Sequence, residues 1–247
     1  MLKGIDVSHW DDFSDVGSLP IDFVIVKSTQ GTNFIDSGRM GFYRSIKTHN
    51  KLFGFYHFAN GDSPESEAAW FYENSIDWMN EGIPILDFEI EVNNPAQWCE
   101  QFITKFHELS GKWCVIYVSA SLCSLFAYSW IPQKCELWVA GYPKNYHDWP
   151  PSEIPYNIRP WSWAAMWQFS SELVINGMQF DGNYAYVEPS QWLDLTKSGN
   201  TPQPQPQPVN DYLTPFARDV IAGKYGNGAE RKERIFRAVQ DRVNELV

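Results

Sequence analysis

Alternating apolar and polar positions mark a series of short strands along the chain up to residue 184. In the stretch IPILDFEIE at residues 83–91, Leu86, Phe88 and Ile90 alternate with a second set of residues, which is the two-residue period of a strand. Seven further runs are rich in β-branched and aromatic residues and are bounded by loop-forming residues. The predicted strands lie at residues 3–10, 23–31, 52–60, 83–91, 113–119, 136–142, 164–170 and 177–184.

Helical patterns separate most of the early strands. Residues 37–50, 64–80 and 95–109 predict helices, and the second and third begin at Ser-Pro and Asn-Pro, with proline at the first helical position. Strands that alternate with helices favour right-handed βαβ units closing into a barrel. Because the helical patterns thin out after Tyr142, we predict an α/β fold, a modified TIM-like barrel of about five β/α units followed by helix-poor final strands.

Two acidic residues share one face of the predicted strand at residues 83–91. Asp87 and Glu89 are two positions apart, so their Cα atoms lie roughly 6.5 Å apart. Two carboxyl groups this close cannot both ionise easily, and one pKa rises. A carboxylic acid that keeps its proton near neutral pH is the general acid that cleavage of a glycosidic bond requires. We assign that proton to Glu89, although D-x-E alone is also common at exposed strand ends.

Polar residues collect at the carboxyl ends of the predicted strands, where barrels of this class carry their chemistry. These residues are Asp6, His9, Gln30, Tyr56, His57, Asp87, Glu89, Tyr117, Tyr142, Gln168 and Asp181. Asp6 lies two residues before Ser8, so the alternative to a catalytic role is that it caps a loop at the strand end. Asp181 is followed by Gly182-Asn183, which is also a plain turn signal.

Aromatic side chains with a polar tip can stack on a sugar ring and also hydrogen-bond to it. The candidate sugar contacts of this kind are Tyr56, Tyr117, Tyr142 and Trp167, with core packing as the alternative for each. Gln168 offers a donor and an acceptor to a sugar hydroxyl or acetamide. His57 points away from its neighbour Tyr56 by strand alternation, which favours a structural histidine.

Charge argues against a nucleic-acid partner. Residues 1–199 contain 12 Lys and Arg against 24 Asp and Glu, and the whole chain carries a net charge of -11. A surface of this sign repels phosphate.

The cysteines are Cys99, Cys114, Cys123 and Cys135. Their spacing lacks a C-x-x-C pair or a histidine partner. We therefore expect buried reduced thiols, no metal and no cofactor.

A change of composition divides the chain near residue 199. Residues 199–210, GNTPQPQPQPVN, predict an extended Pro/Gln-rich linker between a barrel domain at residues 1–198 and a small module at residues 211–247. Three short helical patterns, at residues 213–223, 230–237 and 238–246, predict a three-helix module. A unit this small is marginally stable by itself.

Eight separated motifs resemble one known family. GIDVSHW, FVIVKSTQG, GFYHFA, ILDFE, VIYVS, LWVAGY, MWQFS and FDGN occur in this order over residues 3–192 and resemble the glycoside hydrolase family 25 muramidases. The resemblance implies a β/α barrel that hydrolyses the β-1,4 bond between N-acetylmuramic acid and N-acetylglucosamine in bacterial cell-wall peptidoglycan. It implies that Glu89 is the acid and that Asp87 positions the substrate's acetamido group as the nucleophile, with retention. Asp6 and Asp181 match two further acids of the family site.

Two positions depart from the usual family pattern. Gln30 stands where glutamate is more common in the second motif, and Trp10 stands where a polar residue often ends the first. Both changes leave the carboxyl groups in place, so we expect altered substrate fit or pH optimum with activity retained.

The terminal module also resembles a known unit. I-A-G-K-Y-G-N-G at residues 221–228 and the helical pattern after it resemble the short cell-wall-binding repeat of some phage lysins. The resemblance implies that the module binds wall through the turn residues Tyr225, Asn227 and Gly228 together with Arg231. A single copy would gain avidity from its tether to the barrel.

Two other functions compete with this interpretation. A chitinase or N-acetylglucosaminidase uses the same acetamido chemistry, but its longer motif D-x-x-D-x-D-x-E has an acid where Ile85 stands here. A non-catalytic glycan-binding module would not need both carboxyl groups. We expect no signal peptide and no membrane association, which is typical of a phage-type lysin made in the host cytoplasm or of a protein secreted by a non-classical route.

Overall fold

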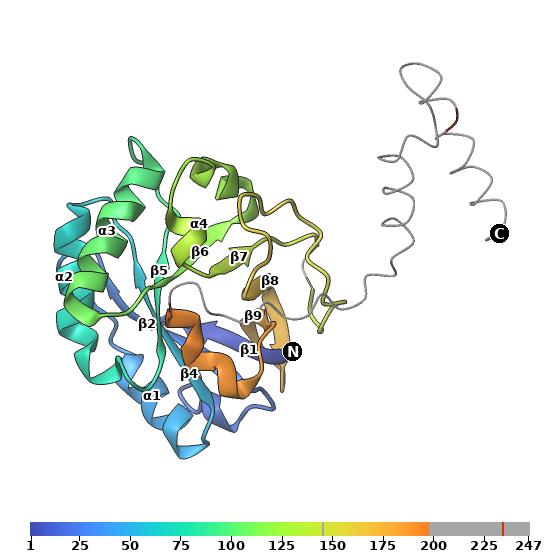
Figure 1. The fold of residues 1–247 in the computed structure, drawn as a ribbon. Coiled ribbons are helices and arrows are strands. Elements are labelled where there is room, and N and C mark those ends of the chain that lie inside the picture. Colours follow the sequence, from blue (N-terminus) through green and yellow to red (C-terminus); the bar gives the residue numbers. More distant parts are fainter. Residues whose placement is uncertain (145, 198–233, 235–247) are drawn as a thin grey trace. The chain divides into compact units, whose positions relative to one another are not determined.

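A computed structural model describes residues 1–144, 146–197 and Arg234 (Figure 1). The chain divides into two units, residues 1–203 and 204–247, and the elements below all belong to the first. The expected linker at residues 199–210 and the expected three-helix module at residues 211–247 lie outside the described residues, apart from Arg234.

The described strands form one sheet that closes on itself. Its order is β1-β9-β8-β7-β6-β5-β4-β2-β3, and β1 also pairs with β2, so eight strands make a barrel and β3 extends β2 at the rim. The strands are β1 (Leu2–Val7), β2 (Phe23–Gln30), β3 (Phe34–Ile35), β4 (Leu52–Phe58), β5 (Ile83–Asp87), β6 (Val115–Ser119), β7 (Leu137–Ala140), β8 (Met166–Ile175) and β9 (Met178–Ala185). The neighbouring barrel strands from β1 through β2, β4, β5, β6 and β7 to β8 are parallel. The short β3 runs antiparallel to β2, and β9 runs antiparallel to both β1 and β8.

Helices cover one side of this barrel (Figure 1). They are α1 (Arg39–Thr48), α2 (Pro64–Ser75), α3 (Pro95–Ser110) and the short α4 (Ile131–Lys134), with 3-10 turns η1 (Val16–Ser18), η2 (Ile76–Trp78), η3 (Ala120–Phe126) and η4 (Pro189–Thr196). Proline begins α2 and α3, as predicted. The predicted barrel and its helix-poor final strands are confirmed, since the described chain between β7 and β9 contains no helix.

The strand that carries the acid pair is shorter than predicted. β5 ends at Asp87, so Glu89 lies in the loop that follows the strand. The reason is that pairing ends there: Asp87 is the last partner of both Phe58 in β4 and Tyr117 in β6. The alternation of apolar and polar residues continues beyond Asp87, but without paired neighbours the backbone lacks the hydrogen bonds between strands that would keep it extended.

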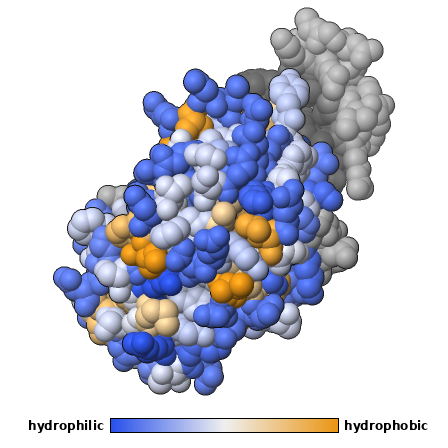
Figure 2. Space-filling view, turned by 90° about the vertical axis from the view of Figure 1, so that its left-hand side faces the viewer, coloured by the Kyte–Doolittle hydropathy of each residue, from blue (hydrophilic) through white to orange (hydrophobic). Residues whose placement is uncertain are grey.

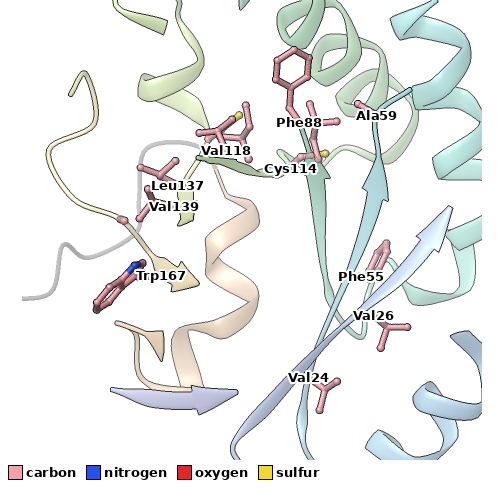
Figure 3. Close-up of a cluster of buried hydrophobic side chains, with 14 of the residues drawn as sticks. Val24, Val26, Phe55, Ala59, Phe88, Cys114, Val118, Leu137, Val139 and Trp167 are labelled. Carbon is pink, nitrogen blue, oxygen red and sulfur yellow. The ribbon is translucent and has the colours of Figure 1, made fainter. Parts of the chain in front are cut away.

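Strand alternation divides the apolar side chains into two layers. One layer fills the barrel, with residues such as Phe23, Ile25, Ile85, Trp138 and Met166. The other lies between the barrel and the helices, and Figure 3 shows part of it. The four cysteines are buried and free.

The interior layer is closed at the amino-terminal end of the strands by η4. Trp192 of η4 is buried, packs 5.0 Å from the ring of Phe23 and donates its indole N–H to the carbonyl of Phe53 at 2.7 Å. The barrel is therefore solid at this end, and its opposite end is the one that can accept a substrate.

His57 is the structural residue that alternation predicted. Its Nδ1 lies 2.8 Å from the Thr29 hydroxyl and its Nε2 lies 2.9 Å from the carboxylate of Glu67, and all three side chains are buried. Glu67 also accepts the backbone N–H groups of Asn60 and Asp62. Burial lowers the pKa of His57, which favours the neutral imidazole, and the side chain links β4 to α2.

The surface over the helices is mostly hydrophilic, with small separate apolar patches (Figure 2). The helices in the described part of the chain are too short or too polar to cross a membrane.

The plug at the closed end gives a stability test. We expect Trp192→Ala to lower the free energy of unfolding by about 3–5 kcal/mol, because it opens a cavity and leaves the Phe53 carbonyl unpaired. Urea unfolding monitored by circular dichroism measures this loss. Leu193→Ala, at a neighbouring exposed position, is the matched control and should change stability little. Equal effects of the two substitutions would contradict the role of η4.

Candidate active site

Four carboxyl groups gather at the open end of the barrel. Asp6 of β1 lies opposite Asp181 of β9 in the antiparallel register, and Asp87 is the last residue of β5, two positions before Glu89. Burial raises the pKa of Asp87 well above its ordinary value, and the charges of Glu89 and Asp6 raise it further. Burial, Asp11 and Glu89 together raise the pKa of Asp181 to about 6. The sequence-predicted acids therefore share one site.

Asp6 is held by two amide side chains. Its Oδ2 accepts the Nε2–H of Gln168 at 2.8 Å and the Nδ2–H of Asn183 at 2.6 Å. Burial and then the charge of Asp181 raise the pKa of Asp6 well above its ordinary value, while the two amide hydrogen bonds lower it. The amides thus fix the direction of the carboxyl group and favour its ionised form.

Asn183 is a site residue that sequence reasoning missed. It lies within β9 and not in a turn, so interpreting Gly182-Asn183 as a turn signal was wrong. Because Asn183 and Asp181 are two residues apart on a strand, both point into the barrel. Trp138 donates its indole N–H to Asn183 Oδ1 at 2.9 Å, which orients the amide toward Asp6. The two-residue spacing from Asp181 was the signal that could have found it.

Gly182 lies between these two polar residues on the opposite face of β9. A Cβ added there would lie 2.7 Å from Phe169 and 2.9 Å from Leu173, closer than such atoms approach. Glycine is needed at this position because the side chains of Phe169 and Leu173 of β8 cover it on the outer face of the sheet.

Gln168 joins the acids to the tyrosines. Its Oε1 accepts hydrogen bonds from the hydroxyl groups of Tyr117, at 2.6 Å, and of Tyr142. Tyr117 is buried, whereas Tyr142 is 39% exposed and reaches the surface of the site. Burial and then the charges of Asp87 and Asp6 raise the pKa of Tyr56 well above its ordinary value, which places this phenol among the acids. The structure thus brings together Tyr56, Tyr117, Tyr142 and Gln168 near the acids.

Trp167 does not belong to this group. Alternation along β8 points Gln168 into the barrel and Trp167 outward, where it is 1% exposed and packs in the outer layer with Val139 and Leu137 (Figure 3). Its indole N–H donates to the carbonyl of Gly141 at 2.9 Å. The expectation that Trp167 contacts a sugar was wrong for this reason, and we leave it out of the site.

Asp87 and Glu89 have different environments. Asp87 is 7% exposed, and its Oδ1 has no hydrogen-bond partner among the residues that the structure describes. Glu89 is exposed at the mouth, although partial burial still raises its pKa. Hydrogen bonding between the two groups raises the pKa of Asp87 and lowers that of Glu89. Asp87 is the more deeply buried of the two, and its pKa is raised further above the ordinary value than that of Glu89.

A buried cation lies beside this pair. Lys27 of β2 donates from Nζ to Gln30 Oε1 at 2.7 Å and sits 4.7 Å from the ring centre of Phe58. Its charge lowers the pKa of Asp87 against the larger effects of burial and the neighbouring acids. Gln30 is neutral, so it holds the lysine without cancelling its charge.

The arrangement can supply a proton and accept one within a single group of neighbouring side chains. An exposed acid at the mouth can protonate a leaving group, and a buried carboxyl group with a free oxygen can accept an N–H donor. This is the chemistry of acid-catalysed bond cleavage with internal assistance.

The raised pKa of Asp181 makes stability depend on pH. Folding raises this pKa from 3.8 to about 6, so the folded chain binds the proton more tightly than the unfolded chain. The resulting stabilisation is present below about pH 4 and is lost as the pH rises through 6. We expect Asp181→Asn to raise the free energy of unfolding by about 1–3 kcal/mol above pH 6 and to give no gain at pH 4.

Chemical denaturation at several pH values measures this difference. Asp12→Asn, at an exposed position in the loop after β1, is the matched control. A gain from Asp181→Asn that is the same at every pH would contradict the raised pKa.

Comparison with known families gives two matches. The model of the family described as glycosyl hydrolases family 25 matches residues 5–178, and the model described as the CW_7 repeat matches residues 215–247.

Individual relatives agree with these matches. Lysozyme M1 of Streptomyces globisporus is 28% identical over 200 residues, covering 73% of this chain and 65% of the relative. The lysozyme of Streptococcus phage Cp-7 is 28% identical over 246 residues, covering 90% of this chain and 62% of the relative. The chain thus spans less than two thirds of the length of these two proteins.

Solved structures share the barrel. The bacterial lysozyme of Streptomyces coelicolor is 25% identical with a TM-score of 0.65, covering 79% of this chain and 96% of that one. The muramidase of Acremonium alcalophilum is 24% identical with a TM-score of 0.66, covering 79% and 98% respectively, and shows the same fold.

Proposed function

Because the chain belongs to glycosyl hydrolase family 25, we propose that it is a peptidoglycan-cleaving lysozyme, an N-acetylmuramidase. Its reaction is hydrolysis of the β-1,4 bond between N-acetylmuramic acid and N-acetylglucosamine. The observation that carries this proposal is the acid pair Asp87 and Glu89 at the end of β5, beside Asp6 and Asp181 at the mouth of the barrel.

Glu89 is the proton donor to the leaving sugar. It is the acid of the pair that reaches solvent at the mouth, where a glycan chain can approach. Its proton goes to the glycosidic oxygen as the bond to the anomeric carbon breaks. The same residue, then ionised, takes a proton from the water that completes hydrolysis.

Asp87 orients the nucleophile, which is the substrate's own acetamido group. The unpartnered Oδ1 of Asp87 accepts the acetamido N–H, and the acetamido carbonyl oxygen bonds to the anomeric carbon. This hydrogen bond favours the ionised form of Asp87, which leaves Glu89 as the member of the pair that carries the proton. Lys27 supports the same ionisation. Attack by water then opens the cyclic intermediate, and the configuration is retained.

The other polar residues position the sugar. Asp6 is fixed by Gln168 and Asn183, and Asp181 lies opposite it, partly exposed. Asp181 can accept hydrogen bonds from the sugar, and its charge favours the positive charge that develops at the anomeric carbon. Tyr142 offers an exposed ring edge to the same sugar, while the buried Tyr56 and Tyr117 form the floor of the site.

The first test removes the proton donor. We expect Glu89→Gln to lower kcat on purified cell wall at least a hundredfold while binding is retained, because the amide keeps the shape of the side chain but cannot donate the proton. Glu91→Gln is the matched control, since Glu91 is an exposed carboxylate two residues further along the same loop. Analysis of the new reducing end should find muramic acid. Glucosamine ends, or cleavage of chitin, would contradict the proposal.

The carboxyl-terminal module anchors the enzyme to the wall. The match to the CW_7 repeat at residues 215–247 supports this role. We propose that Tyr225, Asn227, Gly228 and Arg231 contact the wall, and that the Pro/Gln-rich residues 199–210 act as a spacer between the barrel domain, residues 1–198, and the module, residues 211–247. The chain would then act as a phage-type lysin on bacterial peptidoglycan, with the single repeat gaining avidity from its tether to a second binding site.

The second test removes this module. We expect a chain that stops after Asn200 to pellet less with purified walls and to cleave small soluble glycan fragments at the full-length rate, because only the anchor is lost. Cosedimentation and reducing-sugar release measure the two properties. Unchanged pelleting would remove the anchoring role, and loss of cleavage of the soluble fragments would show that the module serves the active site itself.

A further inference from the structure

A groove of about 400 Å³ lies beside the acids and has no role in the mechanism above. One wall is the loop after β1, with Trp10, Asp11, Asp12 and Phe13. The other wall is the start of β9, with Met178, Gln179 and Phe180.

The register of β1 and β9 places this groove at the open end of the barrel. Asp6 pairs with Asp181 and the strands are antiparallel, so residues 178–180 run past the carboxyl end of β1, alongside the loop that follows it. Asp181 is the residue that follows the second wall in sequence. The first wall contains Asp11, which is close enough for its charge to raise the pKa of Asp6 and Asp181, in addition to the larger effect of burial. The groove therefore adjoins the proposed active site.

Trp10 forms the rim of the groove as a supported, solvent-facing ring. It is 80% exposed, which is unfavourable for a large apolar side chain. The ring lies 4.5 Å from the ring of His9, and His9 in turn lies 5.4 Å from Phe34. The carboxylate of Asp36, itself 1% exposed, contacts both Nδ1 of His9 at 2.7 Å and its backbone N–H at 3.0 Å. A buried anchor thus holds His9, against which Trp10 lies.

The polar residues of the groove suit a neutral, hydroxyl-rich ligand. Asp12 and Gln179 are exposed on opposite walls. The Asp12 carboxylate accepts hydrogen bonds, and the Gln179 amide can both donate and accept them. An exposed aromatic face next to such groups is the usual means of holding a pyranose ring.

We propose that this groove is a glycan subsite that binds a saccharide unit beyond the two sugars joined by the cleaved bond, with Trp10 stacking on its ring and Asp12 and Gln179 bonding to its hydroxyl groups. The inference rests on the proposed muramidase activity. It assigns to the loop after β1 the function of selecting long glycan chains over short fragments.

The test compares chain lengths. Trp10→Ala and wild type are assayed on peptide-free oligosaccharides of alternating N-acetylglucosamine and N-acetylmuramic acid, from tetrasaccharide to octasaccharide. We expect Trp10→Ala to lower kcat/KM about threefold to tenfold on the octasaccharide through a higher KM, and to leave the tetrasaccharide rate unchanged. The matched control is Tyr128→Ala, which removes a fully exposed aromatic ring that lines a different groove, with Asn94 and Leu125.

Each other outcome has a distinct meaning. An equal loss at every length, or no loss at any length, overturns the subsite, as does a loss seen only with glycans that carry stem peptides. If Trp10→Ala does not fold by circular dichroism, Gln179→Ala on the opposite wall provides the same length comparison. Failure of the wild-type chain to cleave any of these glycans would instead refute the muramidase activity, so the two proposals fail separately.

Discussion

The burial of several carboxyl groups at one end of an apolar barrel is the constraint on which the rest of this structure depends. Removing a carboxylate from water is unfavourable unless hydrogen bonds, a cation or a bound proton compensates for the loss. Each of these means is present here. Two amides hold Asp6, Lys27 lies near Asp87, and the raised pKa values of Asp87, Glu89 and Asp181 favour their protonated forms. Acids with raised pKa values are suited to proton transfer, but burying them lowers stability when they ionise.

The barrel accommodates the buried acids by separating apolar and polar side chains along its interior. Near the closed end the inward positions are apolar, and Trp192 and Phe23 fill the space. At the open end the inward positions carry acids, amides and phenols. The solid apolar floor excludes water from below, which strengthens each electrostatic interaction above it. The same floor is rigid and keeps the carboxyl groups in place.

The direction of the last strand is a second determinant. Because β9 is antiparallel to β1, its early residues lie at the mouth of the barrel, so Asp181 reaches the site from the start of a strand, whereas Asp6 and Asp87 reach it from strand ends. The same reversal sets the first residues of β9 against the loop after β1 and creates the groove that Trp10 lines. A complete eightfold parallel barrel would offer neither feature.

The sequence by itself determined the barrel, the helix-poor final strands and the acid pair, because these depend on local periodicity and on residues two positions apart. Only the tertiary structure decided which side chains enter the site. β5 stops at Asp87 because its pairing ends there, and Trp167 points outward although Gln168, the next residue, points inward. Asn183 lies in a strand because β9 pairs with β1 on one side and with β8 on the other. The unequal pKa shifts of Asp87 and Glu89 are also a tertiary property. They follow from the depth of burial, and burial is set by parts of the chain that are distant in sequence.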